Sequence, residues 1–90
     1  MGKYDDRELK QAAYIKARFK VQDAPDFSEL IWVRVSEVQP ARHKVIGRIY
    51  KDGGITDFKM GERVAVDYDD IEDMRRKTSV GVSEMLASLD

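Results

Sequence analysis

The chain has 90 residues, of which 42% are hydrophobic and 37% charged, and its 16 basic and 17 acidic residues give a net charge of −1. This length allows one domain with one hydrophobic core, and the balanced charge excludes a disordered acidic or basic chain. The absence of cysteine excludes disulfides, zinc–thiolate sites and thiol catalysis. No apolar stretch approaches the roughly 20 residues of a membrane span, and the first residues lack a signal-peptide run, so we expect a cytoplasmic protein.

The first predicted element is an amphipathic helix over residues 6–20. Asp5 followed by Glu8 fits a capping box in which an aspartate caps the helix start. Apolar residues then recur at helical spacing and predict a face that covers one side of a sheet. These residues are Leu9, Ala12, Ile15 and Phe19. Residues 21–28 are interpreted as a linker, because Pro25 lacks an amide donor and favours an extended shape before it.

The middle of the chain predicts an antiparallel meander of short strands joined by tight turns. Strands are expected over residues 30–38, 45–50, 55–58 and 63–68. In the first of them, aliphatic side chains at 31, 33 and 35 occupy every second position, which is the period of a half-buried strand. Gly47 predicts a bulge, a bend or close packing by a neighbour. Gly53 and Gly54 predict a tight hairpin turn.

The last third of the chain predicts two helical segments. Acids open residues 69–74 and favour the positive start of a short helix. A terminal helix over residues 78–90 would be capped by Thr78 or Ser79. Its apolar face would be Val82, Met85, Leu86 and Leu89. The expected fold is therefore α+β: an N-terminal helix packed on a curved antiparallel sheet of about four strands, with a C-terminal helix. The single domain 1–90 divides into a core unit, 6–74, and a helical extension, 75–90.

Four segments form a family-like pattern: Ile31-Trp32-Val33-Arg34-Val35-Ser36-Glu37-Val38, Gly47-Arg48-Ile49, Phe58-Lys59-Met60-Gly61-Glu62-Arg63-Val64-Ala65-Val66 and Asp70-Ile71-Glu72-Asp73. They resemble the YegJ-like family, catalogued as domain of unknown function 2314. Its members place a helix before an aromatic-led strand, then a hairpin, a K-x-G-D-x-V turn and an I-x-D-W ending. The resemblance covers residues 6–74 and implies a fold rather than an activity.

Two departures from that family bear on function. Met74 stands where the family has tryptophan, and Lys51-Asp52-Gly53-Gly54 stands where members show an Asn-x-Pro type of turn. We therefore expect a binding role shared through those positions to be lost or changed in this chain.

Few residues indicate a catalytic or metal-binding site. His43, the only histidine, lies in a basic turn with no expected nucleophile or carboxylate partner, and is interpreted as an exposed turn residue. The densest acid run lacks the glycine and the spacing of a calcium loop. It consists of Asp67, Asp69, Asp70, Glu72 and Asp73. We interpret this run as surface charge or as an acidic docking patch. No catalytic residue, metal or cofactor is expected, and the protein is interpreted as not an enzyme.

Trp32 falls on the nominally polar face of its strand, and two explanations stay open. Either a helix covers that face, or Trp32 is an exposed recognition residue. Arg34, Arg48, Trp32 and Tyr50 would share one face if the strand register allows it. Aromatic side chains between cations on a sheet are how single-stranded nucleic acid is bound, although a sequence pI of about 5.8 argues against a dedicated nucleic-acid protein.

The leading functional hypothesis is a small protein-interaction module, in one version an accessory or inhibitory protein of phage or mobile-element origin. Its expected partner is another protein or a second copy of the chain, and no membrane. The contact candidates are Trp32, Tyr50, the acid run and the terminal helix. The alternative is a single-stranded nucleic-acid-binding sheet that uses the basic hairpin of residues 34–51.

Overall fold

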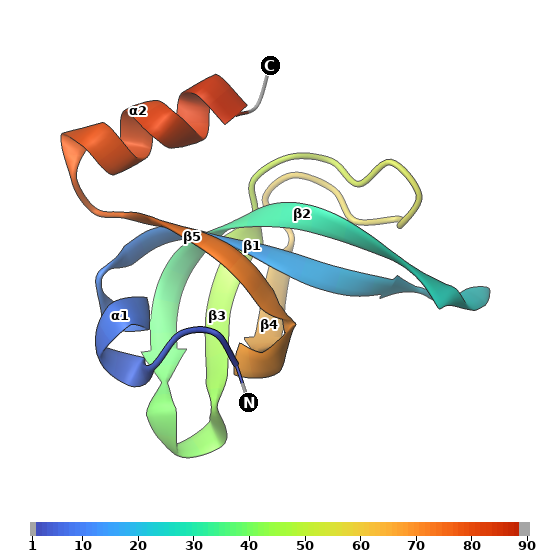
Figure 1. The fold of residues 1–90 in the computed structure, drawn as a ribbon. Helices are drawn as coiled ribbons and strands as arrows, with labels where there is room; N and C mark the ends of the chain where they lie inside the picture. The colour runs from blue at the N-terminus through green and yellow to red at the C-terminus, as the bar shows by residue number, and fades with distance from the viewer. Residues whose placement is uncertain (1, 89–90) are drawn as a thin grey trace.

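The computed structural model describes residues 2–88 and shows an α+β domain built on one five-stranded antiparallel sheet (Figure 1). In chain order the elements are α1 (Asp6–Lys10), β1 (Ala12–Val21), β2 (Ala24–Gln39), the 3-10 turn η1 (Pro40–Arg42), β3 (Lys44–Ile49), β4 (Arg63–Asp67), the 3-10 turn η2 (Tyr68–Asp70), β5 (Ile71–Arg76) and α2 (Ser79–Ser88). The strand order is β4-β3-β2-β1-β5, so the last strand lies beside the first.

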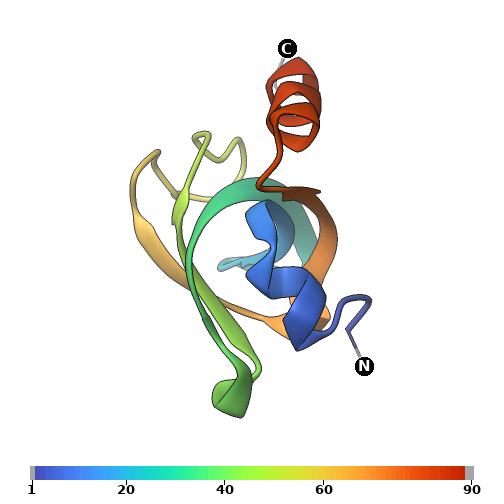
Figure 2. The same cartoon turned by 90° about the vertical axis from the view of Figure 1, so that its left-hand side faces the viewer.

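The sheet is strongly curved. Figure 2 shows the strands bending into most of a ring, with α1 lying across its opening. The long strand β2 makes this possible, because β1 pairs with its first part and β3 pairs with residues from Val33 to Gln39. A register shift between Val35 and Glu37 marks a bulge, which bends the strand and increases its twist.

The hydrophobic core fills the inside of the curve. Where β1 pairs with the middle of β2 the inward residues are odd-numbered, and Ile15 pairs with Val33 while Ala17 pairs with Ile31. The core is drawn from α1, all five strands and η2: Leu9, Ala12, Ile15, Ala17, Ile31, Val33, Val45, Ile49, Val64, Val66, Tyr68 and Ile71. The predicted burial is confirmed for Ile31, Val33, Val64 and Val66, whereas Val35 is only partly buried against the core.

The helix predicted over residues 6–20 is wrong beyond its first turns. Asp5 caps α1 as expected, since the amide of Glu8 donates to Asp5 Oδ1 at 2.8 Å. The helix then ends at Lys10, and residues 12–21 form the strand β1. These residues form a strand because both of its edges are paired, one to β2 and one to β5. This pairing provides hydrogen bonds for the backbone groups of β1 and buries one of its faces.

Three further expectations need correction. The predicted linker 21–28 is the turn of the β1–β2 hairpin and the start of β2. Residues 55–58 are not a strand but part of the long connection 50–62 between β3 and β4, so Gly53-Gly54 does not close a tight hairpin. Residues 69–74 form the end of η2 and most of β5 rather than a helix, because their backbone pairs with β1. The sheet therefore has five strands instead of about four.

The C-terminal helix is confirmed over Ser79–Ser88, while Leu89 and Asp90 lie outside the described residues. Thr78 caps it, as its hydroxyl accepts from the amide of Gly81 at 3.0 Å. The helix contacts β5 and β1. Over residues 2–88, no helix has the length and apolar character needed to cross a membrane.

Gly47 marks a close approach between β3 and β2. It is buried and pairs with Val35, next to the bulge. A Cβ at this position would overlap the carbonyl oxygen of Arg34 and lie 2.6 Å from Cγ1 of Val33. The expectation of close packing by a neighbour is thus confirmed.

We predict that Gly47→Ala lowers the free energy of unfolding by about 2 kcal/mol, because a methyl group must push apart two paired strands. Urea denaturation followed by circular dichroism measures the loss. Gly61→Ala is the matched control: its φ is +90° and nothing lies within 4 Å of its Cβ, so it carries only backbone strain. If Gly47→Ala leaves the free energy of unfolding unchanged, the close approach at Gly47 is contradicted.

Candidate functional site

Strand pairing lines up three arginines across the outer face of the sheet. Arg34 of β2 pairs with Arg48 of β3, and Arg48 pairs with Arg63 of β4. Residues paired directly across antiparallel strands point to the same side. The expectation that Arg34 and Arg48 share a face is therefore confirmed, and Arg63 extends the set. We call Arg34, Arg48 and Arg63 the arginine row.

The arginine row carries charge that its surroundings do not neutralise. All three side chains are exposed. Arg48 donates to the carbonyl oxygen of Gly61 at 2.9 Å, but within residues 2–88 no carboxylate forms an ion pair with any of the three. Like charges directly opposite each other destabilise a sheet. The row therefore weakens the fold, and an anionic ligand would offset that cost.

Two tyrosines continue the outer face next to the arginine row. Tyr14 of β1 pairs with Arg34, and its ring centroid lies 4.8 Å from that of Tyr50 at an interplanar angle of 64°. Both rings are half-buried. The hydrogen bond with Tyr50, and then burial, raise the pKa of Tyr14 above its ordinary value. Tyr14 therefore stays protonated and neutral at physiological pH, so it adds an aromatic surface to the face without adding negative charge.

The explanation of Trp32 as an exposed recognition residue is wrong. Trp32 is only 6% exposed, yet it lies on the outer face and outside the main core cluster. Its cover is cationic: Nζ of Lys16 lies 5.5 Å and Cζ of Arg75 5.1 Å from a Trp32 ring centroid. Cations over an indole are attracted by its ring electrons. Trp32 is thus buried, and two basic side chains lie over its ring.

A recess of about 390 Å³ opens on this same face beside Trp32. Lys16, Leu30 and Trp32 line it from β1 and β2, and Lys51, Asp52 and Gly54 line it from the connection 50–62. Leu30 is 46% exposed, so the recess offers apolar surface to solvent. Its volume lies at the lower end of the roughly 300–1,000 Å³ of small-ligand sites.

Glu29 holds the wall of the recess in place. Its carboxylate accepts from the amides of Gly54, Ile55 and Thr56 and from the hydroxyl of Thr56, at distances from 2.5 to 3.1 Å. Burial acts to raise the pKa of Glu29, but these hydrogen bonds outweigh it and hold the pKa below its ordinary value. One strand residue thereby fixes a loop about 25 residues further along the chain.

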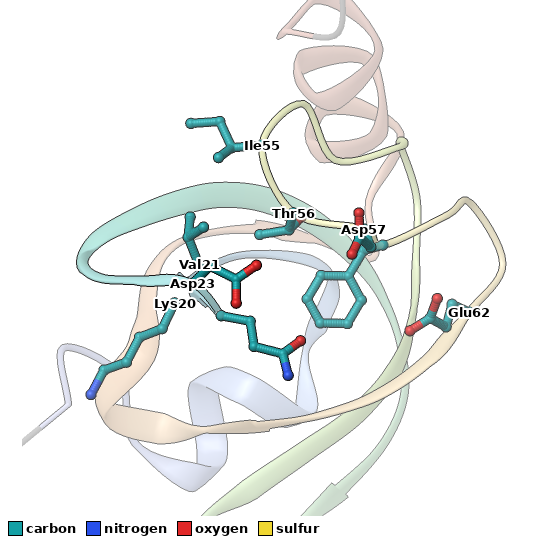
Figure 3. A pocket seen from close by; sticks show the side chains of 9 residues that line it. Lys20, Val21, Asp23, Ile55, Thr56, Asp57 and Glu62 are labelled. Carbon is teal, nitrogen blue, oxygen red and sulfur yellow. The ribbon is translucent and has the colours of Figure 1, made fainter.

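A second hollow of about 400 Å³ lies between the tip of the β1–β2 hairpin and the connection 50–62 (Figure 3). Its charged lining is mostly acidic, with Asp23, Asp57 and Glu62 against Lys20. This acidic lining is unfavourable for binding an anion, whereas the face that carries the arginine row is favourable.

The acid run does not gather on one surface. Asp67 ends β4 and pairs with Lys44 at 2.6 Å, whereas Asp69 and Asp70 lie in η2. Glu72 of β5 pairs with Arg18 at 2.6 Å and with Lys3 at 2.9 Å. The hydrogen bond from Lys3 lowers the pKa of Glu72.

The last residue of the run serves the basic face itself. Asp73 pairs with Arg75 at 2.9 Å, which steadies the guanidinium that covers Trp32. At least three of the five carboxylates are therefore paired within the chain, which leaves less acidic charge for a docking patch.

His43 is exposed, as expected, and lies in the left-handed conformation at φ 51°. Its ring stacks on Tyr68 with centroids 5.3 Å apart. Tyr68 donates to Asp6 at 2.6 Å, and burial followed by this bond raises the pKa of Tyr68 to about 12. The arrangement ties the η1 turn and α1 to the core. Within residues 2–88, no group of three or more potential ligand side chains is placed to hold a metal ion.

Sequence reasoning missed four contributors to the face: Tyr14, Lys16, Arg63 and Arg75. Tyr14 and Lys16 were hidden in a predicted helix. The signal was present, because Lys16, Arg18 and Lys20 alternate with apolar residues at the period of a strand.

Comparison with known proteins adds no assignment, since none of the family models, curated proteins or solved structures matches the chain. The resemblance to the YegJ-like family stays a prediction.

We predict that Glu29→Gln lowers the free energy of unfolding by about 1 kcal/mol at neutral pH, because an amide group can no longer accept all the loop donors. Glu37→Gln on the exposed part of β2 is the matched control. Since the folded pKa of Glu29 is depressed, its contribution is present at neutral pH and is lost as the pH falls through that pKa. Urea denaturation should therefore give the unmodified protein and Glu29→Gln the same free energy of unfolding in acid. A difference in unfolding free energy that stays constant at every pH contradicts the role of the charge.

Proposed function

We propose that this protein is a non-enzymatic interaction module that holds an anionic partner on the outer face of its sheet. The observation that supports this most strongly is the arginine row, in which three exposed guanidinium groups pair across three strands without a neutralising carboxylate in the described chain. A cost to stability that the fold itself does not need is a mark of a functional surface.

The geometry of the row suits a ligand with repeated negative charges. Neighbouring strands are about 4.8 Å apart, so three adjacent strands carry their arginines over about 10 Å. Guanidinium groups bind carboxylates and phosphates through two parallel hydrogen bonds. Because the side chains rise from paired strands rather than from a loop, their spacing is fixed before the partner arrives, and less ordering is required on binding.

The distribution of the other charges supports the same surface. The net charge is only −1, but much of the acid run is paired with Lys44, Lys3, Arg18 and Arg75. The arginine row keeps its positive potential at short range even though the whole chain is close to neutral. Such a local field steers an anionic partner to one face.

Two classes of partner carry the required charge: an acidic surface on another protein, and nucleic acid. An accessory or inhibitory role for a phage or mobile-element protein belongs to the first class. The aromatic side chains beside the row favour the second.

We predict that Arg34→Glu combined with Arg48→Glu lowers affinity for heparin, a polyanion without bases, by about tenfold or more at low salt. Glutamates in these positions keep a like-charged pair, so the stability of the sheet should change little. Arg7→Glu combined with Lys77→Glu changes the net charge equally at exposed positions outside the strands. Isothermal titration compares the three proteins. Equal affinity of both double variants would remove the arginine row from the proposal.

A further inference from the structure

Building on the proposed function, we propose that the anionic partner is a single-stranded nucleic acid and that the recess beside Trp32 holds one of its bases. The arginine row would bind the phosphates, and the recess would bind a base turned out of the strand.

The two parts of this site are adjacent on one strand. Arg34, Trp32 and Leu30 are alternate residues of β2 and point to the same side of the sheet. Alternate residues are separated by about 6–7 Å. A phosphate at Arg34 and a base above Trp32 and Leu30 can therefore belong to one nucleotide or to neighbouring ones.

The recess has the chemistry of a base site. Leu30 supplies an exposed apolar surface, the buried Trp32 forms part of the wall, and Tyr14 and Tyr50 pack against each other nearby. Lys16 and Lys51 line the recess together with two carboxylates, Glu29 and Asp52, which already accept backbone amides of the connection 50–62. Stacking on aromatic and apolar side chains, combined with a cationic groove, is the general means of holding single strands.

The recess is also formed before any ligand binds. Glu29 fixes Gly54 by its carboxylate, and Asp52 accepts from the amide of Met60 at 2.6 Å. The bond from Gly54 to Glu29 holds the connection 50–62 against β2, and the bond from Met60 to Asp52 closes the connection on itself. A preformed site loses less conformational entropy on binding.

A single strand fits this site better than a duplex. In a duplex the faces of the bases are stacked and cannot enter a recess, whereas unpaired bases can be splayed onto protein side chains. An acidic protein would satisfy the arginines but would leave the recess empty. The base is thus what separates the two classes of partner.

The experiment uses three probes: a thymidine decamer, an abasic decamer with the same phosphates, and poly-L-glutamate. Trp32 is the only tryptophan, so its fluorescence reports the recess directly. We expect the thymidine decamer to quench Trp32 and to bind about tenfold more tightly than the abasic strand, since one stacked base contributes a factor of this order. Equal affinity for the two strands, with no change in Trp32 fluorescence, overturns the base site and leaves the proposed anion-binding face intact.

The other outcomes separate the two proposals. Binding of poly-L-glutamate without binding of either strand overturns the nucleic-acid inference and favours an acidic protein. Binding of none of the three probes overturns the proposed function as well.

A pair of variants controls for folding. Leu30→Glu places a negative charge in the recess at an already exposed position, and should abolish the advantage of the thymidine strand over the abasic strand. Phe27→Glu makes the same change in charge on the same strand, at a side chain that is 65% exposed and outside the recess, and should leave the advantage unchanged. If both variants behave alike, the recess is not the base site.

Discussion

The register in which β2 pairs with its neighbours is the constraint on which the rest of the molecule depends. Val33 lies opposite Ile15 and Ile49, so the core closes on the inner side. In the same register, Arg34 lies opposite Tyr14 and Arg48 on the outer side. A shift by one residue would reverse every side chain of β2. It would bury arginine among aliphatic residues, which is why the core and the binding face specify each other.

Two features near the middle of β2 keep that register. Gly47 lets β3 approach the backbone of Arg34, and the bulge after Val35 bends β2 at the same level. Towards its N-terminal end, β2 extends past the residues that pair with β3, and there the connection 50–62 lies beside it. Glu29 binds that connection through its backbone amides. The curvature of the sheet, the hydrogen bonds of Glu29 to the connection and the recess are therefore consequences of one long strand.

The division of charge follows from the same architecture. Acidic side chains meet basic ones mainly at β5 and at the ends of β3 and β4, where Glu72, Asp73 and Asp67 are paired. The arginine row crosses β2, β3 and β4 within the sheet, where the opposed residues are themselves arginines. A sequence that is nearly neutral overall can in this way present one cationic surface.

The sequence was enough to predict the middle of the fold but not its outer strands. Residues 31–35 and 63–66 alternate cleanly, and each forms a strand with its aliphatic side chains inside. Residues 12–21 fit two periods at once: Leu9, Ala12, Ile15 and Phe19 suit a helix, while residues 15–21 also alternate. Local pattern cannot decide between these, because the choice depends on pairing with β5, about 60 residues away. The site was partly foreseeable for the same reason: Arg34 and Arg48 lie on well-predicted strands, whereas Arg75 and Tyr14 lie on missed ones.

The hydrogen bonds of Glu29 had no sequence signal, since its four donors are three backbone amides and one hydroxyl of a loop far along the chain. The recess that they build was equally invisible, because a recess is a property of how a loop and a strand are placed together.

The most direct test of the account is a nuclear magnetic resonance titration of the labelled protein with a thymidine decamer, following the backbone amides and the arginine Nε–Hε groups. The account predicts that the shifts concentrate on Arg34, Arg48 and Arg63 and on the amides around Trp32 and Leu30, and that residues of the acidic hollow at Asp23 and Asp57 stay unchanged. Shifts centred on that hollow or on α2, with the three arginines unaffected, would contradict it.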